Sequence, residues 1–265
     1  MKKIVLLSSA LMMTALLHAQ QKEGKVLYER TAQMNFRIES DQVSQLLPKT
    51  RTDKFELTFG NNQSIWKHID DEDNTDELTG GGGMQIKIMT PGQNDITFCD
   101  FNLGKKIEQK EIFDKKFIVT DSIQKLNWKL TGETQTILNH VCQKAVAQKI
   151  GKRTEMNIDN GVMSRKELDD TANIVAWFTT DIPVPAGPEF PGQLPGLILA
   201  IEMNKGSVVY KATELTPGAD VATIKEPTKG KPVTPDEFKK EQQKMMDEMQ
   251  KNNEGGGRRM IRVQD

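Results

Sequence analysis

The segment that decides the fold is Trp177-Phe-Thr-Thr-Asp-Ile-Pro-Val-Pro-Ala-Gly-Pro-Glu-Phe-Pro-Gly-Gln-Leu-Pro-Gly-Leu-Ile-Leu-Ala-Ile-Glu202, which holds five of the 11 prolines in a chain of 265 residues. Each proline fixes φ and removes a backbone donor, so the middle of the segment cannot form a central strand or a helix. The residue before each proline is also restricted to extended conformations. The sequence therefore predicts an extended or turning connection, which we call the strap (residues 181–196).

Strand-like pieces flank the strap at residues 174–180 and 197–203, and these anchor it to a sheet. Because the strap cannot form a regular ladder, apolar side chains must hold it, and we expect Leu194, Leu197 and Ile198 to insert into the concave or open end of the sheet. Pro195-Gly196 suits a type II turn with Gly196 at φ > 0. Two interpretations follow: the strap plugs the core, or it forms the lip of a binding site.

Strand patterns fill most of the remaining chain. Over residues 24–39, apolar residues such as Val26, Tyr28 and Phe36 alternate with polar ones, which is typical of a half-buried strand. Turn signals of a few residues separate the runs, so neighbouring strands should pair antiparallel. Further short runs of this kind lie at 53–59, 64–69, 84–89, 95–101, 105–113, 116–120, 128–131, 134–137, 142–150, 159–167, 174–180, 197–203 and 207–215.

More than ten strands predict an all-β fold. A sheet of this size must curl or close to protect its edges and its apolar face. We expect a large curved antiparallel sheet, half-barrel or barrel-like, formed by residues 20–216 as a single domain. A two-sheet sandwich is the alternative.

The N-terminus has the pattern of a secretory signal peptide. Lys2 and Lys3 precede an apolar run, and the small residue Ala19 precedes Gln20. The apolar run is shorter than the roughly 18 residues that a membrane anchor needs. We expect cleavage after Ala19, no transmembrane span, and export to the periplasm or the outer-membrane surface.

Residues 217–265 form a polar tail with one expected helix. Thr234-Pro-Asp-Glu237 combines an N-cap, a proline at the first helical position and an acidic residue three places after the cap. A helix is predicted over about 235–252, and its narrow apolar stripe could dock on the sheet or on a partner.

Composition and the acidic loop give little chemistry. Of the 36 basic residues, 34 remain after Lys2 and Lys3 are removed, against 37 acidic ones, which does not favour nucleic-acid binding. Residues 70–83 are acidic and glycine-rich, which is typical of a solvated loop. A calcium site there would use Asp70, Asp71, Asp73 and Asp76, but the spacing of an EF-hand is missing.

Catalytic and metal-binding motifs are equally scarce. His68 and His140 are the histidines that follow the expected signal peptide, neither lies in a nucleophile motif, and a hydrolase would need a dispersed site. Copper binding by methionine with a histidine is a second alternative, although methionines at helical spacing are more often packing residues. No cofactor motif is present. The methionines concerned are Met245, Met246, Met249 and Met260.

Cys99 and Cys142 are the two cysteines, and they are 43 residues apart. In an oxidising compartment the first expectation is one disulfide, worth about 4 kcal/mol on the chain-entropy model. Two buried free thiols in adjacent strands are the alternative.

Three segments of the chain form a recurrent pattern: Trp128-Lys-Leu-Thr131, Ile137-Leu-Asn-His-Val-Cys-Gln-Lys-Ala145 and Gln193-Leu-Pro-Gly-Leu-Ile198. With these segments the chain resembles the GLPGLI family of Bacteroidetes envelope proteins, although Gln193 replaces the first glycine of the family motif. Family membership implies an envelope protein of unassigned function. The residues of the family motif, which could also line a lip, are Trp177, Pro183, Pro185, Gly187, Pro188, Leu194, Pro195, Gly196, Leu197 and Ile198.

These observations favour a non-enzymatic envelope protein that binds an apolar ligand or an envelope partner through its curved sheet.

Overall fold

The computed structural model describes residues 21–33, 49–69, 77–80, 84–87, 92–112, 114–159 and 162–253. Side chains are described in the same ranges, except at 77–80, 84–87, 153–159, 162–167 and 249–253. The expected signal peptide lies outside the described residues, as do the four aspartates of the calcium alternative. None of the helices in the described ranges is long and apolar enough to cross a membrane.

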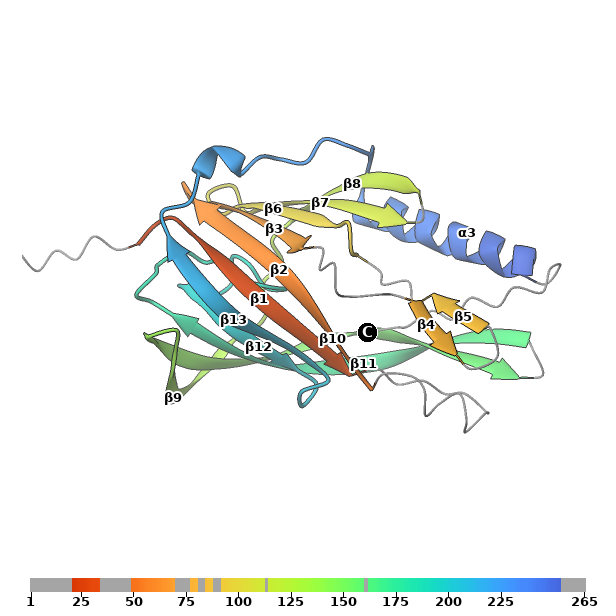
Figure 1. Ribbon diagram of the computed structural model, residues 1–265, viewed down its shortest axis with the longest axis horizontal. Helices are drawn as coiled ribbons and strands as arrows, with labels where there is room; N and C mark the ends of the chain where they lie inside the picture. Colours follow the sequence, from red (N-terminus) through yellow and green to blue (C-terminus); the bar gives the residue numbers. More distant parts are fainter. Residues whose placement is uncertain are drawn as a thin grey trace, which may run out of the picture.

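One long sheet dominates the structure (Figure 1). A separate ladder is formed by β4 (Glu77–Gly80) and β5 (Met84–Lys87), so a strand occupies part of the acidic segment that the sequence analysis interpreted as a loop. The long sheet contains β1 (Gly24–Gln33), β2 (Thr50–Gly60), β3 (Gln63–Ile69), β6 (Ile96–Asp100), β7 (Lys105–Ile112), β8 (Lys115–Ser122), β9 (Lys129–Ile137), β10 (His140–Asp159), β11 (Val162–Thr179), β12 (Leu197–Met203), β13 (Val208–Pro217) and β14 (Lys231–Val233).

The order of strands in the long sheet is β14-β8-β7-β6-β3-β2-β1-β13-β12-β11-β10-β9. Every pairing in it is antiparallel except that of β14 with β8, which is parallel. The sheet does not close, because β14 and β9 are its two ends. This confirms the expected all-β fold with a large, mainly antiparallel sheet. The two-sheet sandwich, which was the alternative prediction, is not what the described residues form.

The curvature of the sheet has local causes. Register shifts occur at Leu27/Tyr28 between β1 and β13, at Trp177/Phe178 between β11 and β12, and at Gln143/Ala145 between β10 and β9. An irregularity of this kind bends a strand and increases its twist, which lets a long sheet curl. Figure 1 shows the result: β1 and β2 run between the β6–β8 side and the β10–β11 side of a curled sheet.

The hairpin of β10 and β11 is longer than the sequence analysis predicted. Runs near 142–150 and 159–167 were expected as separate strands, but the two strands pair continuously from Gln143↔Phe178 to Asp159↔Val162. Beyond the pair of Ala147 and Ile174 they pair only with each other in the described sheet, and Ile150 is 84% exposed. Where both faces of a ribbon meet water, no alternation of apolar residues marks the strand in the sequence.

The strap supplies much of the main core. Its buried residues include Ile182, Val184, Phe190 and Leu194, and they join side chains from β1, β2 and β10–β13 in one cluster. Leu197 and Ile198, which begin β12, are buried in the same cluster. A buried connection needs partners for its backbone groups. Leu197 N–H donates to Ile182 O at 3.0 Å and Ile198 N–H donates to Ala186 O at 2.9 Å.

The C-terminal helix forms as predicted. α3 (Pro235–Asn253) begins with a reciprocal capping box: Glu237 N–H donates to Thr234 Oγ1 at 3.2 Å, and Thr234 N–H donates to Glu237 Oε2 at 2.8 Å. Phe238 and Met245 pack on Phe117 of β8 and on neighbouring apolar residues. The helix therefore docks on the sheet, beside β14.

Candidate functional site

Hydrogen bonds from three aromatic side chains tie the strap and the start of β12 to the rest of the molecule. Tyr28 Oη donates to Ile198 O at 2.6 Å, and Tyr210 Oη donates to Glu189 Oε1 at 2.6 Å. Trp128 Nε1 donates to Gln193 Oε1 at 2.9 Å, and the same oxygen accepts the backbone N–H of Leu126 at 2.9 Å. Gln193, which departs from the motif glycine, is therefore an acceptor for the segment that leads into β9.

The motif residues lie along this fixed strap, and most of them are inaccessible. Gly187, Pro188, Leu194, Gly196, Leu197 and Ile198 are buried, Trp177 and Pro185 are half-buried, and Pro183 and Pro195 are exposed. The motif residues that reach the surface are therefore Pro183 and Pro195, with Trp177 and Pro185 in part. The burial of Leu194, Leu197 and Ile198 matches the interpretation of the strap as a plug.

Gly196 corrects one expectation. It does not adopt φ > 0; within the strap, positive φ occurs at Gly187, Glu189 and Gly192. Glycine is needed at position 196 for a different reason, since a Cβ there would overlap the carbonyl group of Thr179. Close approach of two backbone segments, rather than left-handed backbone, explains this residue.

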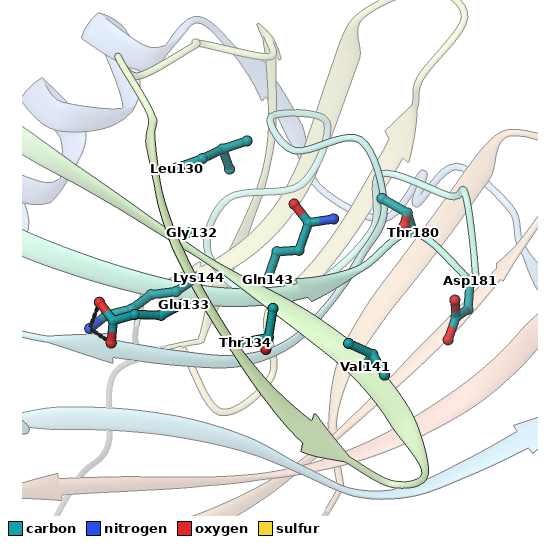
Figure 2. Close-up of a pocket in the computed structure, with 9 residues that line it drawn as sticks. All are labelled: Leu130, Gly132, Glu133, Thr134, Val141, Gln143, Lys144, Thr180 and Asp181. Atoms are coloured by element: carbon teal, nitrogen blue, oxygen red, sulfur yellow. Dashed lines mark hydrogen bonds and ion pairs between the residues drawn. The ribbon is translucent and has the colours of Figure 1, made fainter.

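A hollow of about 340 Å³ lies where the strap begins, between it and the hairpin of β9 and β10. We call it the rim pocket. Figure 2 shows Leu130 and Gly132 of β9 on one side of the hollow and Thr180 and Asp181 on the other. The full lining consists of Leu130, Gly132, Glu133, Thr134, Val141, Gln143, Lys144, Thr180 and Asp181.

The lining of the rim pocket combines apolar and charged groups. Leu130 is 62% exposed and Val141 is 57% exposed. Lys144 Nζ contacts both carboxylate oxygens of Glu133, at 3.0 and 2.9 Å, and lies 5.7 Å from the ring centre of Trp177. The hydrogen bond from Lys144 lowers the pKa of Glu133. Such a surface can bury an apolar group while it offers hydrogen bonds and one ion pair around it.

His140 lies beside Asp181, a lining residue of this pocket, with His140 Nδ1 and Asp181 Oδ2 3.3 Å apart. Cys142 lies close to them, and its thiol donates to the carbonyl oxygen of His140 at 3.6 Å. A cysteine, a histidine and an aspartate resemble a nucleophilic set by type alone. The thiol is fully buried, however, and burial raises its pKa to about 11, so the thiolate that a nucleophile requires is disfavoured.

The expected disulfide is not formed, because Cys99 and Cys142 are both free and buried. Cys99 lies on β6, opposite Ser64 of β3, and Cys142 lies on β10. The alternative of two buried free thiols is confirmed, but six strands separate β6 from β10 in the sheet order, so the two thiols do not lie in adjacent strands. Burial raises the pKa of Cys99 to about 12, which makes this thiol unreactive as well.

His68 belongs to a buried ionic cluster on β1–β3. Asp53 is fully buried; burial alone would raise its pKa, but hydrogen bonds from Arg51 and Arg30 lower it below the usual value. The shortest contacts to its two carboxylate oxygens are 2.7 Å from each arginine. His68 Nε2 lies 3.9 Å from Asp53 Oδ1. Paired buried charges of this kind are structural, since each compensates the desolvation of the other.

Metal ligands do not gather in the described part of the chain, where no group of three or more His, Cys, Asp or Glu residues could hold an ion. Met245 is buried against β8 and β14 and acts as a packing residue. Met260 and the side chain of Met249 lie outside what the structure describes.

Sequence reasoning missed the rim pocket. Residues 128–131 and 134–137 were interpreted as two strands, whereas the structure has one strand, β9, with Gly132 at φ 82° inside it. Leu138 and Asn139 then form the two-residue turn to β10, both at positive φ. Leu138-Asn139 is not one of the Asn-Gly or Asp-Gly pairs that mark a two-residue hairpin turn, so only Asn139, which tolerates left-handed backbone, was a signal.

The family model that matches part of this chain names no activity. Residues 128–200 match a family model described as a protein of unknown function (Porph_ging), and this range contains β9, the rim pocket and the strap. A search of curated proteins gave no match.

Among solved structures, PNGF-II in the C2 space group is similar, with a TM-score of 0.52 and 15% identity over 84% of this chain. The similar region is 33% of that PNGF-II chain, so this chain spans about a third of its length. PNGF-II in the P21 space group aligns with a TM-score of 0.48 and 14% identity, over 83% of this chain and 32% of that one. At this identity the likeness is one of fold.

Proposed function

We propose that this chain is a non-catalytic binding protein of the cell envelope, of the GLPGLI type, exported by its N-terminal signal peptide. The rim pocket captures a ligand or an envelope partner. The observation that carries this proposal is the placement of exposed apolar side chains. Four large hydrophobic residues are strongly exposed in the described ranges, namely Leu103, Leu130, Val141 and Ile150, and two of them line this one hollow.

The position of the strap supports a site at the rim rather than inside the curved sheet. Ile182, Phe190 and Leu194 occupy the apolar interior together with side chains of the sheet. An apolar ligand would have to displace these groups to enter. A ligand at the rim pocket meets Leu130 and Val141 without any such displacement, and Gln143 and Asp181 offer polar contacts beside them.

The chemistry beside the pocket supports binding over catalysis. Cys142 is buried with a raised pKa, and His140 is paired with Asp181. Lys144 is engaged by Glu133. The occupant best suited to this lining is amphipathic, with an apolar part against Leu130 and Val141 and hydrogen-bonding groups toward Gln143 and Thr180.

Native mass spectrometry of the exported protein tests the proposal. The wild type should carry a co-purified species, and Val141→Glu should lower its occupancy at least tenfold, because a carboxylate then faces the apolar part of the ligand. Leu103→Glu is the matched control: Leu103 is 73% exposed in the turn between β6 and β7, away from the pocket, and its variant should keep wild-type occupancy. Equal occupancy in Val141→Glu, or an empty wild type, would contradict the proposal.

A further inference from the structure

The two edge strands of the long sheet, β14 and β9, differ in how far they are protected from pairing with another strand. At one end β14 has three residues, includes Pro232 and lies beside α3, which are common ways to protect an edge strand. At the other end β9 has nine residues, and its outer edge pairs with no strand in the described ranges. Every residue from Lys129 to Thr136 is exposed, so neither face of this strand is covered there.

The turn geometry identifies which backbone groups of β9 point outward. Leu138 and Asn139, at φ 47° and 65°, form a two-residue turn, and Ile137 pairs with His140. In such a hairpin the residues that flank the turn form a hydrogen-bonded pair, and pairs along the ladder then alternate. The amide and carbonyl groups of Thr136 and Thr134 therefore face away from β10, toward the open edge.

We propose that the open edge of β9 pairs with β9 of a second copy of this chain, antiparallel about a two-fold axis, to form a continuous sheet across a dimer. A two-fold interface must be self-complementary. Pairing about Gln135 places Thr134 of one copy opposite Thr136 of the other and Glu133 opposite Ile137, so no like charges lie opposite one another.

Analytical ultracentrifugation of three proteins tests the dimer. The wild type should sediment as a concentration-dependent dimer. Thr136→Pro removes one outward N–H without removing a hydrogen bond to β10, a change that edge strands tolerate. It should raise the dimer dissociation constant at least tenfold. Thr136→Val, which keeps the N–H and the strand preference, should leave that constant within about twofold.

Amide hydrogen exchange of the wild type provides a readout that needs no variant. The amides of Thr134 and Thr136 should exchange fast in dilute protein and slow down as the dimer forms. A monomeric wild type, a dimer unaffected by Thr136→Pro, or protection that does not change with concentration would overturn the proposal. The last result would mean that another segment covers the edge. Thr136 does not line the rim pocket, so failure of this dimer and failure of ligand capture are separate results.

Discussion

At the scale of single residues, the strap depends on close approach between backbones. Gly196 has no room for a Cβ because the carbonyl group of Thr179 occupies that space. The identity of this residue could be predicted as important from the Pro195-Gly196 pair, but its reason could not. A turn signal predicts left-handed backbone from local sequence, whereas the end of β11 comes near only in the folded chain.

A valine at position 196 should destabilise the protein by about 1–3 kcal/mol or more, because a branched side chain must push two buried segments apart. Gly151→Val is the matched control. Gly151 lies in β10 without positive φ, and a Cβ there meets nothing within 4 Å. Its variant should change the free energy of unfolding by less than about 0.5 kcal/mol. Urea titration measures both, and equal effects of the two variants would refute the close-approach explanation.

At the scale of elements, local signals succeeded where local chemistry determines the element. Thr234 and Glu237 predicted the start of α3 because a capping box is complete within four residues. The prolines of the strap excluded a regular strand ladder because each proline acts locally, through its fixed φ and its missing N–H. The length of the β10–β11 ribbon and the position of β9 at the sheet edge were not predicted, because pairing partners far along the chain decide both.

As an element, the strap should behave as part of the core. Leu197 is fully buried at its end, and Leu197→Ala should destabilise the protein by about 2–5 kcal/mol through lost burial and the cavity left behind. Leu103→Ala, at an exposed turn, should cost less than about 0.5 kcal/mol. Thermal and urea unfolding compare the two. A wild-type melting temperature for Leu197→Ala would show that the strap contributes little to the core.

At the scale of the whole molecule, the strap fills the interior of the curved sheet, which is why we place the proposed binding surface at the rim. The alternating pattern of β1 predicted one apolar face, and the structure buries Val26 and Tyr28 on it as expected. The sequence could not say that the strap would fill the space above this face, nor that the rim pocket would form, because Leu130, Val141 and Asp181 come together only through the fold. The expected disulfide between Cys99 and Cys142 was wrong for the same reason, because the number of residues between two cysteines does not determine the distance between them in the folded chain.

The central claim is that the strap is a permanent part of the core, so that ligands bind at its rim and do not enter beneath it. Amide hydrogen exchange at Leu197 and Ile198 tests it most directly, because these N–H groups donate to Ile182 and Ala186 within the folded strap. We predict that both amides exchange only through global unfolding, with the same free energy as the slowest amides of β1 and β2. Exchange of Leu197 and Ile198 at a much lower free energy than those amides would show that the strap opens, and would contradict the account.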